Sequence, residues 1–278
     1  MKIGEVLGYG IETQTAAVDA SRKALLCPFR QTRCTKSSIS DPIGVCSLRS
    51  GTEAAALCPV RFVENNRIFS DAATLAFGTG TTFAVFPEIR VLTIPGTKGD
   101  ENQKKIGKVD YLIGRLSEET VVDFAAIEVQ AAYFSGNSIR PALTAFLAGD
   151  TQPLNDLDRR PDFRSSAQKR LMPQLQLKVP IFRRWGKKFF VVSDTLFFKS
   201  LPKFPVVSQA NSELTWLTYP IAASGTNFKM QNPIIVHSAW DDVNNALREG
   251  KPPEPAEILA ELQTKLHKSK SMIRRLRT

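Results

Sequence analysis

Two acidic residues in the middle of the chain, Asp110 and Glu128, lie in neighbouring apolar segments, KVDYLI and FAAIEVQAA. The polar stretch SEE between these segments predicts a hairpin. A hairpin centred on Glu119 would place Asp110 directly opposite Glu128, with their Cβ atoms about 5 Å apart. Two carboxylates at that separation can share a hard divalent cation such as Mg²⁺. The chemistry predicted for the pair is metal-assisted hydrolysis, in which the cation polarises a phosphoryl oxygen and activates a bound water.

Three further polar residues lie near this pair in the sequence. Gln130 lies two residues beyond Glu128, on the same face of the predicted strand, and can orient a water or a phosphate oxygen. Its amide offers hydrogen bonds only, so it cannot act as a base. Asp123 is a rival partner for Glu128, but in the same extended strand it would lie about 16 Å away, too far to share an ion. Glu88, in the segment FPEIR, is a further candidate ligand.

The alternative to a metal-binding pair is a cross-strand polar pair on a solvated face. The residues around Glu128, from Phe124 to Ala132, are apolar except for Glu128 and Gln130 themselves. A strand that is apolar on both faces is typical of one buried on both faces. A buried carboxylate without a cation is energetically costly, so this composition favours the metal-binding pair.

All four cysteines of the chain fall within 32 consecutive residues: Cys27, Cys34, Cys46 and Cys58. Two disulfides and four buried free thiols are the alternatives to a shared metal ion. The region from Cys27 to about Ser50 is polar and loop-rich, which indicates that a staple is needed there. Four thiolates around one ion indicate Zn²⁺ or iron, and the spacing does not separate the two.

The charge distribution indicates a polyanionic partner. The formal net charge is +10, and residues 151–203 hold 12 Lys or Arg against four Asp. A second basic cluster runs from Lys265 to Arg277. Such concentration supplies sequence-independent attraction to phosphates, as nucleic-acid binding requires, although a solvated basic surface is the alternative. With two His and no glycine-lysine phosphate loop, the sequence offers neither a Ser/His/Asp arrangement nor a P-loop.

The order of the elements predicts an α/β or α+β core with a mixed sheet. Strands are expected in 82–94, 108–116, 120–134, 187–193, 212–221 and 232–239, and helices in 12–26, 240–250 and 252–278. Leu171, Leu175, Val179 and Phe182 recur at helical spacing, although Pro173 and Pro180 should kink or interrupt that helix.

We expect three parts: an N-terminal cysteine segment at 1–75, a catalytic core with the basic region at 76–250, and a basic C-terminal helix at 251–278. No apolar run reaches the roughly 18 residues that cross a bilayer, and the first residues lack the pattern of a secretory signal. The expected location is therefore the cytoplasm, with no membrane partner.

Several segments together resemble restriction endonucleases of the NotI type. These are CPFRQTRCTKSS, DPIGVCSL, ALCPVRFVENNRIF, KVDYLI and FAAIEVQAAYFSG, within about Arg22–Gly136. Weaker support comes from QKRLMPQLQLK and RRWGKKFFVVSD. The resemblance implies a PD-(D/E)xK nuclease core with Gln in place of the Lys. It maps the active site onto Asp110, Glu128 and Gln130, with Glu88 as a less secure match.

The same resemblance implies an iron ion bound by the four cysteines and a homodimer that cuts GC-rich palindromes in double-stranded DNA. The function expected from it is that of a Mg²⁺-dependent type II restriction endonuclease. The alternative from another class is a non-catalytic DNA-binding protein that uses a Cys₄ metal module and a basic surface.

Overall fold

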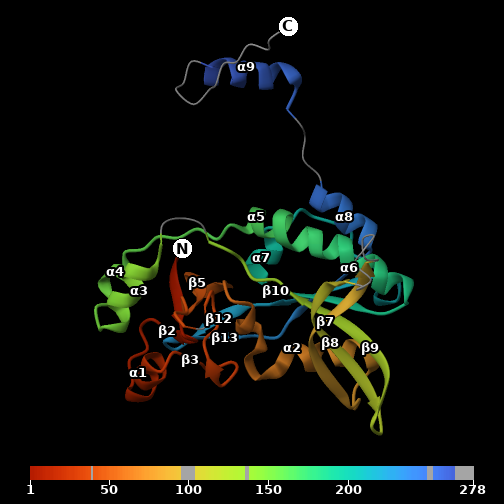
Figure 1. The fold of residues 1–278 in the computed structure, drawn as a ribbon, viewed down its shortest axis with the longest axis horizontal. Helices are drawn as coiled ribbons and strands as arrows, with labels where there is room; N and C mark the ends of the chain where they lie inside the picture. The colour runs from red at the N-terminus through yellow and green to blue at the C-terminus, as the bar shows by residue number, and fades with distance from the viewer. Residues whose placement is uncertain (39, 95–103, 135–137, 249–252, 267–278) are drawn as a thin grey trace. The chain divides into compact units, whose positions relative to one another are not determined.

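The computed structural model describes residues 1–38, 40–94, 104–134, 138–248 and 253–266 (Figure 1). The chain divides into two compact units, Met1–Leu247 and Arg248–Thr278. Both candidate sites lie in the first unit. No helix within the described ranges is both long enough and apolar enough to cross a membrane.

The larger sheet of the first unit is mixed, as predicted. Its strand order is β14-β11-β10-β9-β8-β7. The three central strands β9, β10 and β11 run parallel, and the others pair antiparallel. The strands are β7 (Phe83–Ile94), β8 (Lys104–Ser117), β9 (Thr120–Val129), β10 (Phe189–Asp194), β11 (Leu214–Tyr219) and β14 (Ile234–Ser238).

The hairpin of β8 and β9 has the register that the sequence predicts at its active-site end. Tyr111 pairs with Ile127, and the same register continues to Arg115 opposite Asp123. The next position places Asp110 at the level of Glu128. The hairpin turn has a two-residue loop, which is tighter than a hairpin centred on Glu119 requires. A bulge after Arg115 accounts for the difference, because it takes up one residue before the loop. Beyond this bulge the predicted register no longer applies.

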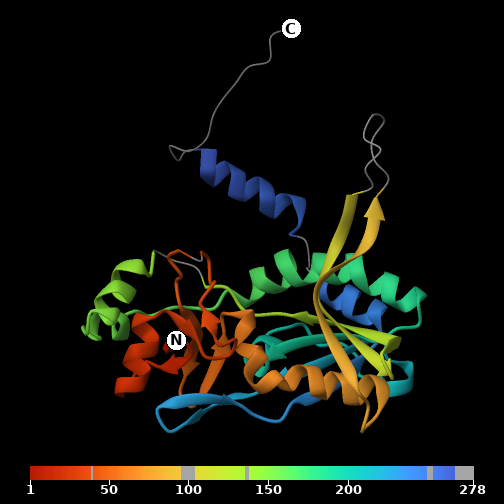
Figure 2. The ribbon, with the colours of Figure 1, turned by 60° about the horizontal axis from the view of Figure 1, so that its bottom comes forward.

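Helices cover both faces of the larger sheet (Figure 2). Helix α6 (Met172–Arg184) packs with Ala126 on one face of β9, and helix α2 (Arg67–Phe77) packs with Ile127 on the other. All residues of β9 from Ala125 to Val129 are buried. The prediction that this strand is buried on both faces is therefore confirmed.

The proline-containing segment forms one helical stretch rather than separate pieces. A short helix α5 (Phe163–Ser166) leads into a π-helical segment, Ala167–Leu171, and then into α6. Pro173 lies in the first turn of α6, where its missing N–H is no loss. Pro180 lies inside α6, which continues past it to Arg184. Neither proline ends the helical stretch, so the predicted interruption is wrong.

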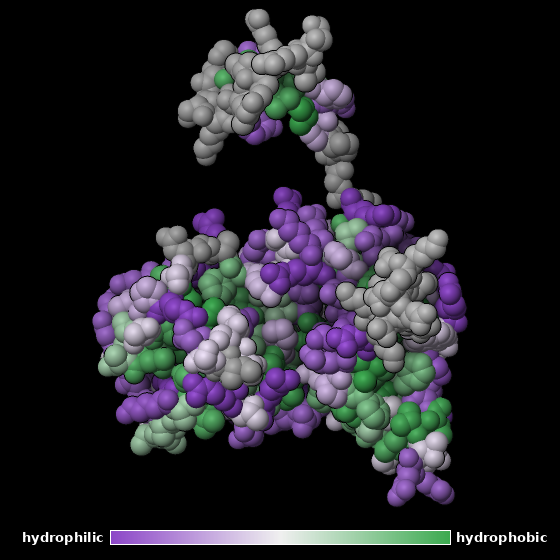
Figure 3. Space-filling view, viewed as in Figure 1, coloured by the Kyte–Doolittle hydropathy of each residue, from purple (hydrophilic) through white to green (hydrophobic). Residues whose placement is uncertain are grey.

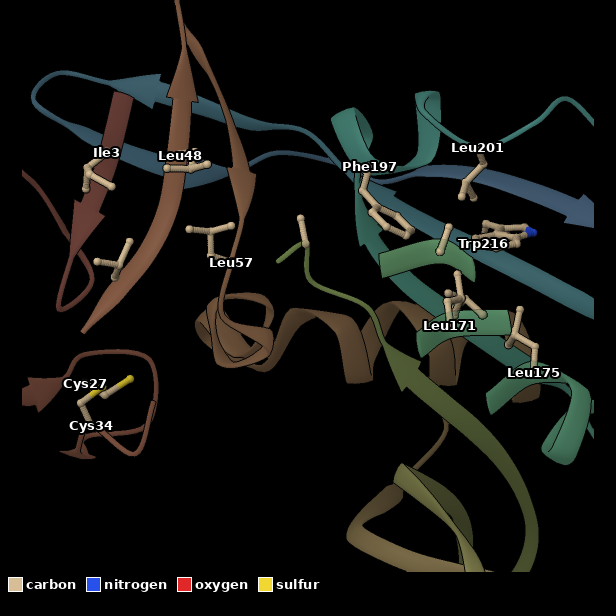
Figure 4. Packing of buried hydrophobic residues seen from close by; sticks show 14 of the residues in the cluster. Ile3, Cys27, Cys34, Leu48, Leu57, Leu171, Leu175, Phe197, Leu201 and Trp216 are labelled. Carbon is tan, nitrogen blue, oxygen red and sulfur yellow. The ribbon is translucent and has the colours of Figure 1, made fainter. Parts of the chain in front are cut away.

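A second sheet, not predicted from the sequence, has the order β13-β12-β6-β5-β1-β2. Strand β5 contributes fully buried Val45 and Leu48 to the core, and Figure 4 shows Ile3, Leu48 and Leu57 among the packed residues. The region from Cys27 to Ser50 therefore enters a core by pairing with distant parts of the chain. Its strands are β1 (Lys2–Val6), β2 (Tyr9–Gly10), β5 (Val45–Ser50), β6 (Glu53–Ala56), β12 (Ile221–Ser224) and β13 (Asn227–Met230).

This second sheet belongs to the same compact unit as the larger sheet, and the division of the chain into three domains stays a prediction. The predicted helix at 12–26 is α1 (Ala16–Lys23), begun by the Thr15 hydroxyl, which accepts a hydrogen bond from Val18 N at 3.2 Å. Gly250, the last residue of the helix expected at 240–250, and the basic residues after Leu266 lie outside the described residues. The remaining elements are β3 (Leu26–Cys27), β4 (Thr32–Arg33), a 3₁₀ segment (Pro59–Asn66), α3 (Arg140–Leu147), α4 (Gln152–Asn155), α7 (Thr195–Lys199), a second 3₁₀ segment (Gln209–Asn211), α8 (Trp240–Arg248) and α9 (Pro255–Leu266).

Candidate active site

Asp110 and Glu128 meet where β8 and β9 lie side by side. The Asp110 carboxylate accepts a hydrogen bond from Val129 N at 2.8 Å, and the Glu128 carboxylate accepts one from the Asp110 backbone. Each carboxylate is thus hydrogen-bonded to the backbone of the other strand. Glu128 is only 6% exposed, whereas Asp110 is half-buried.

Burial and mutual repulsion act on the charges of this pair. Burial raises the pKa of Glu128 to about 7, and the nearby Asp110 charge adds to the rise. Burial also raises the pKa of Asp110. Two carboxylates whose charged forms are disfavoured in this way gain stability from a cation. Mg²⁺ suits such a pair because it binds through one or two carboxylates and completes its shell with waters and phosphate oxygens.

Lys178 is the residue of this site that the sequence analysis did not identify. Its Nζ lies 2.8 Å from Glu128 Oε2, and the side chain is 1% exposed. Its positive charge also favours the ionised form of Asp110. The signal was present in the sequence, because Lys178 falls among Leu175, Val179 and Phe182 on the buried face of α6. A lysine at an apolar position of an amphipathic helix indicates a buried carboxylate partner.

Gln130 follows directly after the end of β9. Its backbone N–H donates to Val192 O at 2.8 Å, which continues the pairing with β10. Its side-chain Nε2 donates to Ala131 O at 2.6 Å, and the residue is 8% exposed. The amide is therefore held close to its own backbone, beside the pair.

Glu88 lies in register with Asp110, its charge helps to raise the pKa of Asp110, and its side chain pairs with Lys108. Pro87 opposite Tyr111 and Ile89 opposite Val109 bracket this position. Glu88 has φ 60°, a left-handed conformation that is uncommon for a residue with a side chain, and such strain clusters at functional sites. Its side chain is 69% exposed, and its carboxylate accepts a hydrogen bond from Lys108 at 2.8 Å, which lowers the Glu88 pKa.

The rival Asp123 is paired elsewhere, since its Oδ1 lies 2.6 Å from Lys187 Nζ. In the described part of the chain, no three His, Cys, Asp or Glu side chains are arranged to hold a metal ion. The site therefore provides two protein carboxylates, Asp110 and Glu128, as ligands for a cation. Waters or a DNA phosphate would have to supply the other ligands.

The four cysteines are all free and buried. Figure 4 shows Cys27, the last residue of β3, close to Cys34, which directly follows β4. Burial raises the pKa of Cys27, Cys46 and Cys58, and the charges of the other thiols contribute to each rise. The thiols are thus near one another in space, although within the described ranges they do not form a ready-made metal-binding arrangement.

Backbone amides point at three of the four sulfurs. Hydrogen bonds of this kind favour thiolate over thiol, as metal binding requires. One of them, from Gly8 N to Cys46 Sγ, measures 3.2 Å. The chemistry of this donor set therefore fits a thiolate-bound ion. The amide donors are Phe29 and Arg30 for Cys27, Gly8 for Cys46 and Val60 for Cys58.

The sequence matches the family described as restriction endonuclease NotI over residues 5–230. The chain belongs to the NotI restriction endonuclease family. The match spans 226 of the 278 residues and includes both carboxylates, Lys178 and the four cysteines. A search of curated proteins finds no match.

Membership of the NotI family makes the chain a restriction endonuclease, a nuclease that binds double-stranded DNA. The basic region predicted to bind phosphates forms, in part, the surface over α5 and α6, where hydrophilic residues gather (Figure 3). Exposed Arg164, Lys169 and Arg170 lie there. The Arg170 guanidinium stacks over the ring of Tyr133, which lies three residues beyond Gln130. This pair places a positive charge close to the end of β9. Helices α8 and α9 lie outside the residues matched to the family.

Proposed function

We propose that this restriction endonuclease is of type II and hydrolyses double-stranded DNA with Mg²⁺ held by Asp110 and Glu128. The observation that carries the proposal is the cross-strand meeting of the half-buried Asp110 with the buried Glu128 beside a lysine. Bound Mg²⁺ supplies Lewis-acid stabilisation of the phosphoryl oxygen and a water of lowered pKa.

The protein's own residues then position and shield the reaction. Asp110 and Glu128 hold the cation and so fix where the scissile phosphate lies. Helix α6 excludes bulk water from the Glu128 side of the sheet. Gln130 orients a water or a phosphate oxygen through its amide, without accepting a proton. Glu88, one strand away, is a further ligand if its side chain leaves Lys108. On this basis we propose a PD-(D/E)xK nuclease site with Gln in place of the Lys.

We also propose that the four cysteines hold a structural metal ion, iron or alternatively Zn²⁺. Its support is their burial, their freedom from disulfides and the amides directed at their sulfurs. Four protein ligands leave no open coordination position, so the role of the ion is structural. Chelation of the ion should therefore lower stability more than it changes the chemistry of cleavage.

Two copies of the chain are proposed to act on a palindrome, GC-rich as the resemblance implies. A two-fold symmetric protein presents the same surface to both halves of such a site, so each copy cuts one strand.

Incubation of plasmid DNA with the protein and Mg²⁺ tests the nuclease. Discrete bands are expected, and they should disappear with Glu128→Ala. Retarded but uncut DNA would instead support the non-catalytic DNA-binding protein. Sequencing of the cleaved ends gives the palindrome and the stagger.

Cleavage at limiting Mg²⁺ is expected to weaken as the pH falls below about 7. The raised pKa of Glu128, about 7, means that the protonated form grows as pH falls through that value, and this form cannot bind the cation. The raised pKa of Asp110 acts in the same direction. Because protons and Mg²⁺ compete, saturating Mg²⁺ should move the acid limb to lower pH. Rates measured across pH at low and high Mg²⁺ check this, and one profile for both would contradict it.

Removal of the charge near Tyr133 is expected to weaken DNA binding evenly across sequences. Arg170→Gln should reduce the slope of log affinity against log salt by about 1, as for the loss of one phosphate contact. Lys23→Gln, an exposed lysine on α1, is the matched control and should leave the slope unchanged. Titration of labelled duplexes at several salt concentrations provides the measurement. Equal slopes for wild type and Arg170→Gln would exclude this contact.

A further inference from the structure

Lys178 lies on the buried face of α6, where the other side chains are apolar. The buried residues of α6 are Leu175, Lys178, Val179 and Phe182, and of these Lys178 is the only one that carries a charge. Its exposure of 1% is far below what is typical of a lysine. A buried ammonium costs several kcal/mol unless it is paired, so its place in the core depends on its partner.

The partner is the carboxylate pair of the active site. Lys178 Nζ lies 2.8 Å from Glu128 Oε2, and its charge also acts on Asp110. The lysine therefore reaches, from a helix, the place where β8 and β9 bring the two acids together. Lys108 of the hairpin also acts on Asp110 with its charge, but it is exposed and pairs with Glu88, and position 130 is a glutamine.

Cleavage beside these carboxylates needs a positive charge on the scissile phosphate as negative charge develops on its oxygens. Gln130 cannot supply that charge, and its amide donates to Ala131 O. We propose that Lys178 is a catalytic residue of this nuclease, which supplies the charge that Gln130 lacks by donating from its ammonium to a scissile-phosphate oxygen. The proposal rests on the proposed function and names a further residue of the same site.

The geometry supports this role through the donors of the ammonium. An ammonium has three donors, and one of them is directed at Glu128. The other two remain available to a phosphate oxygen held beside the same carboxylate. Lys178 keeps its proton throughout, so it acts by charge and hydrogen bonding, and the proton released by the attacking water goes to solvent.

A purely structural role is the competing explanation, in which Lys178 only neutralises Glu128. The two roles predict different cleavage rates when Lys178 is lost and a lysine is placed at position 130 instead. If the charge itself acts on the phosphate, Gln130→Lys should compensate for the loss of Lys178, because position 130 is two residues along the strand from Glu128. If Lys178 serves the packing of α6, a lysine at 130 should restore nothing.

The experiment compares Lys178→Met, Lys178→Gln, Lys178→Met with Gln130→Lys, and wild type. Lys178→Gln keeps a hydrogen-bond donor for the buried Glu128 carboxylate. It therefore takes the place of Lys178→Met in the comparison if Lys178→Met does not fold. Lys23→Met is the control, since Lys23 is an exposed lysine on α1, outside the basic region 151–203. Three quantities are measured: the single-turnover cleavage rate with Mg²⁺, the DNA affinity with Ca²⁺ in place of Mg²⁺, and the unfolding temperature without metal.

We expect both single variants at Lys178 to fold and to bind DNA with Ca²⁺ within about tenfold of wild type. Their cleavage rates should fall by about 10²- to 10³-fold, as for the loss of one transition-state donor. The double variant should regain at least tenfold of that rate, and Lys23→Met should cut as wild type does.

Cleavage near the wild-type rate by the folded Lys178 variants would overturn the proposal. So would a loss of cleavage that Gln130→Lys does not restore, because that result assigns Lys178 to the support of Glu128 alone. Both outcomes leave the nuclease function intact, since wild type still cuts. Failure of wild type itself to cut any DNA would remove the nuclease function, and the role of Lys178 with it.

Discussion

Asp110→Asn is expected to reduce the rate of DNA cleavage by about 10³-fold or more. The metal contributes several kcal/mol of transition-state stabilisation, and each 1.4 kcal/mol is a factor of about ten in rate. Asparagine keeps the shape of the side chain and can still accept the hydrogen bond from Val129 N. It loses the charge and one of the two carboxylate oxygens that a cation needs. The loss should therefore fall on catalysis and leave the hairpin in place.

Asp123→Asn is the matched control for this change. Asp123 lies on the same strand as Glu128, and its carboxylate pairs with Lys187, away from the site. Its exposed ion pair is worth at most about 1 kcal/mol, so cleavage should remain within about twofold of wild type. Single-turnover rates at saturating Mg²⁺, with unfolding temperatures alongside, make the comparison. Cleavage by Asp110→Asn at the rate of Asp123→Asn would exclude Asp110 as a ligand.

Cys46→Ser is expected to lower the unfolding temperature by about 10 °C while cleavage persists at temperatures where the variant is folded. A structural Cys₄ ion contributes about 10–16 kcal/mol to folding, and loss of one ligand forfeits a substantial part of this. For a protein of this size, 1 kcal/mol corresponds to about 2–4 °C. Cys46 is 6% exposed and accepts from Gly8 N, so its sulfur joins the cysteine segment to the loop after β1.

Thr32→Ser is a control in the same segment, because Thr32 is exposed between Cys27 and Cys34 and carries no candidate ligand. Thermal unfolding should show no shift for this variant. Elemental analysis of wild type should find one metal ion per chain, and iron should give a coloured protein with a thiolate-to-metal absorption band. Wild-type protein without metal, together with an unshifted Cys46→Ser, would refute the cysteine site.

The hairpin that joins the two acids could be predicted because its determinants are local. Two apolar segments, a short polar turn and two acids at matching distances from that turn sufficed to place Asp110 opposite Glu128. The bulge after Arg115 was not predictable. Even so, the strand pairing at the site has the register of the predicted hairpin centred on Glu119. Burial of β9 on both faces also followed from its composition, since an apolar strand needs cover on each side.

The chain's sequence alone therefore determined the carboxylate pair, the clustered cysteines and a mixed sheet. The tertiary structure decided what surrounds them: Lys178 comes to Glu128 from 50 residues away, and Glu88 turns to Lys108 through its left-handed backbone. It also decided the second sheet, which pairs β6 with β12 from far along the chain. The physical reason is that short-range pattern sets the register of a hairpin, whereas contacts between distant segments depend on how helices and sheets pack. The buried partner of an active-site acid is such a contact, and only the packing of α6 against β9 brings it to the site.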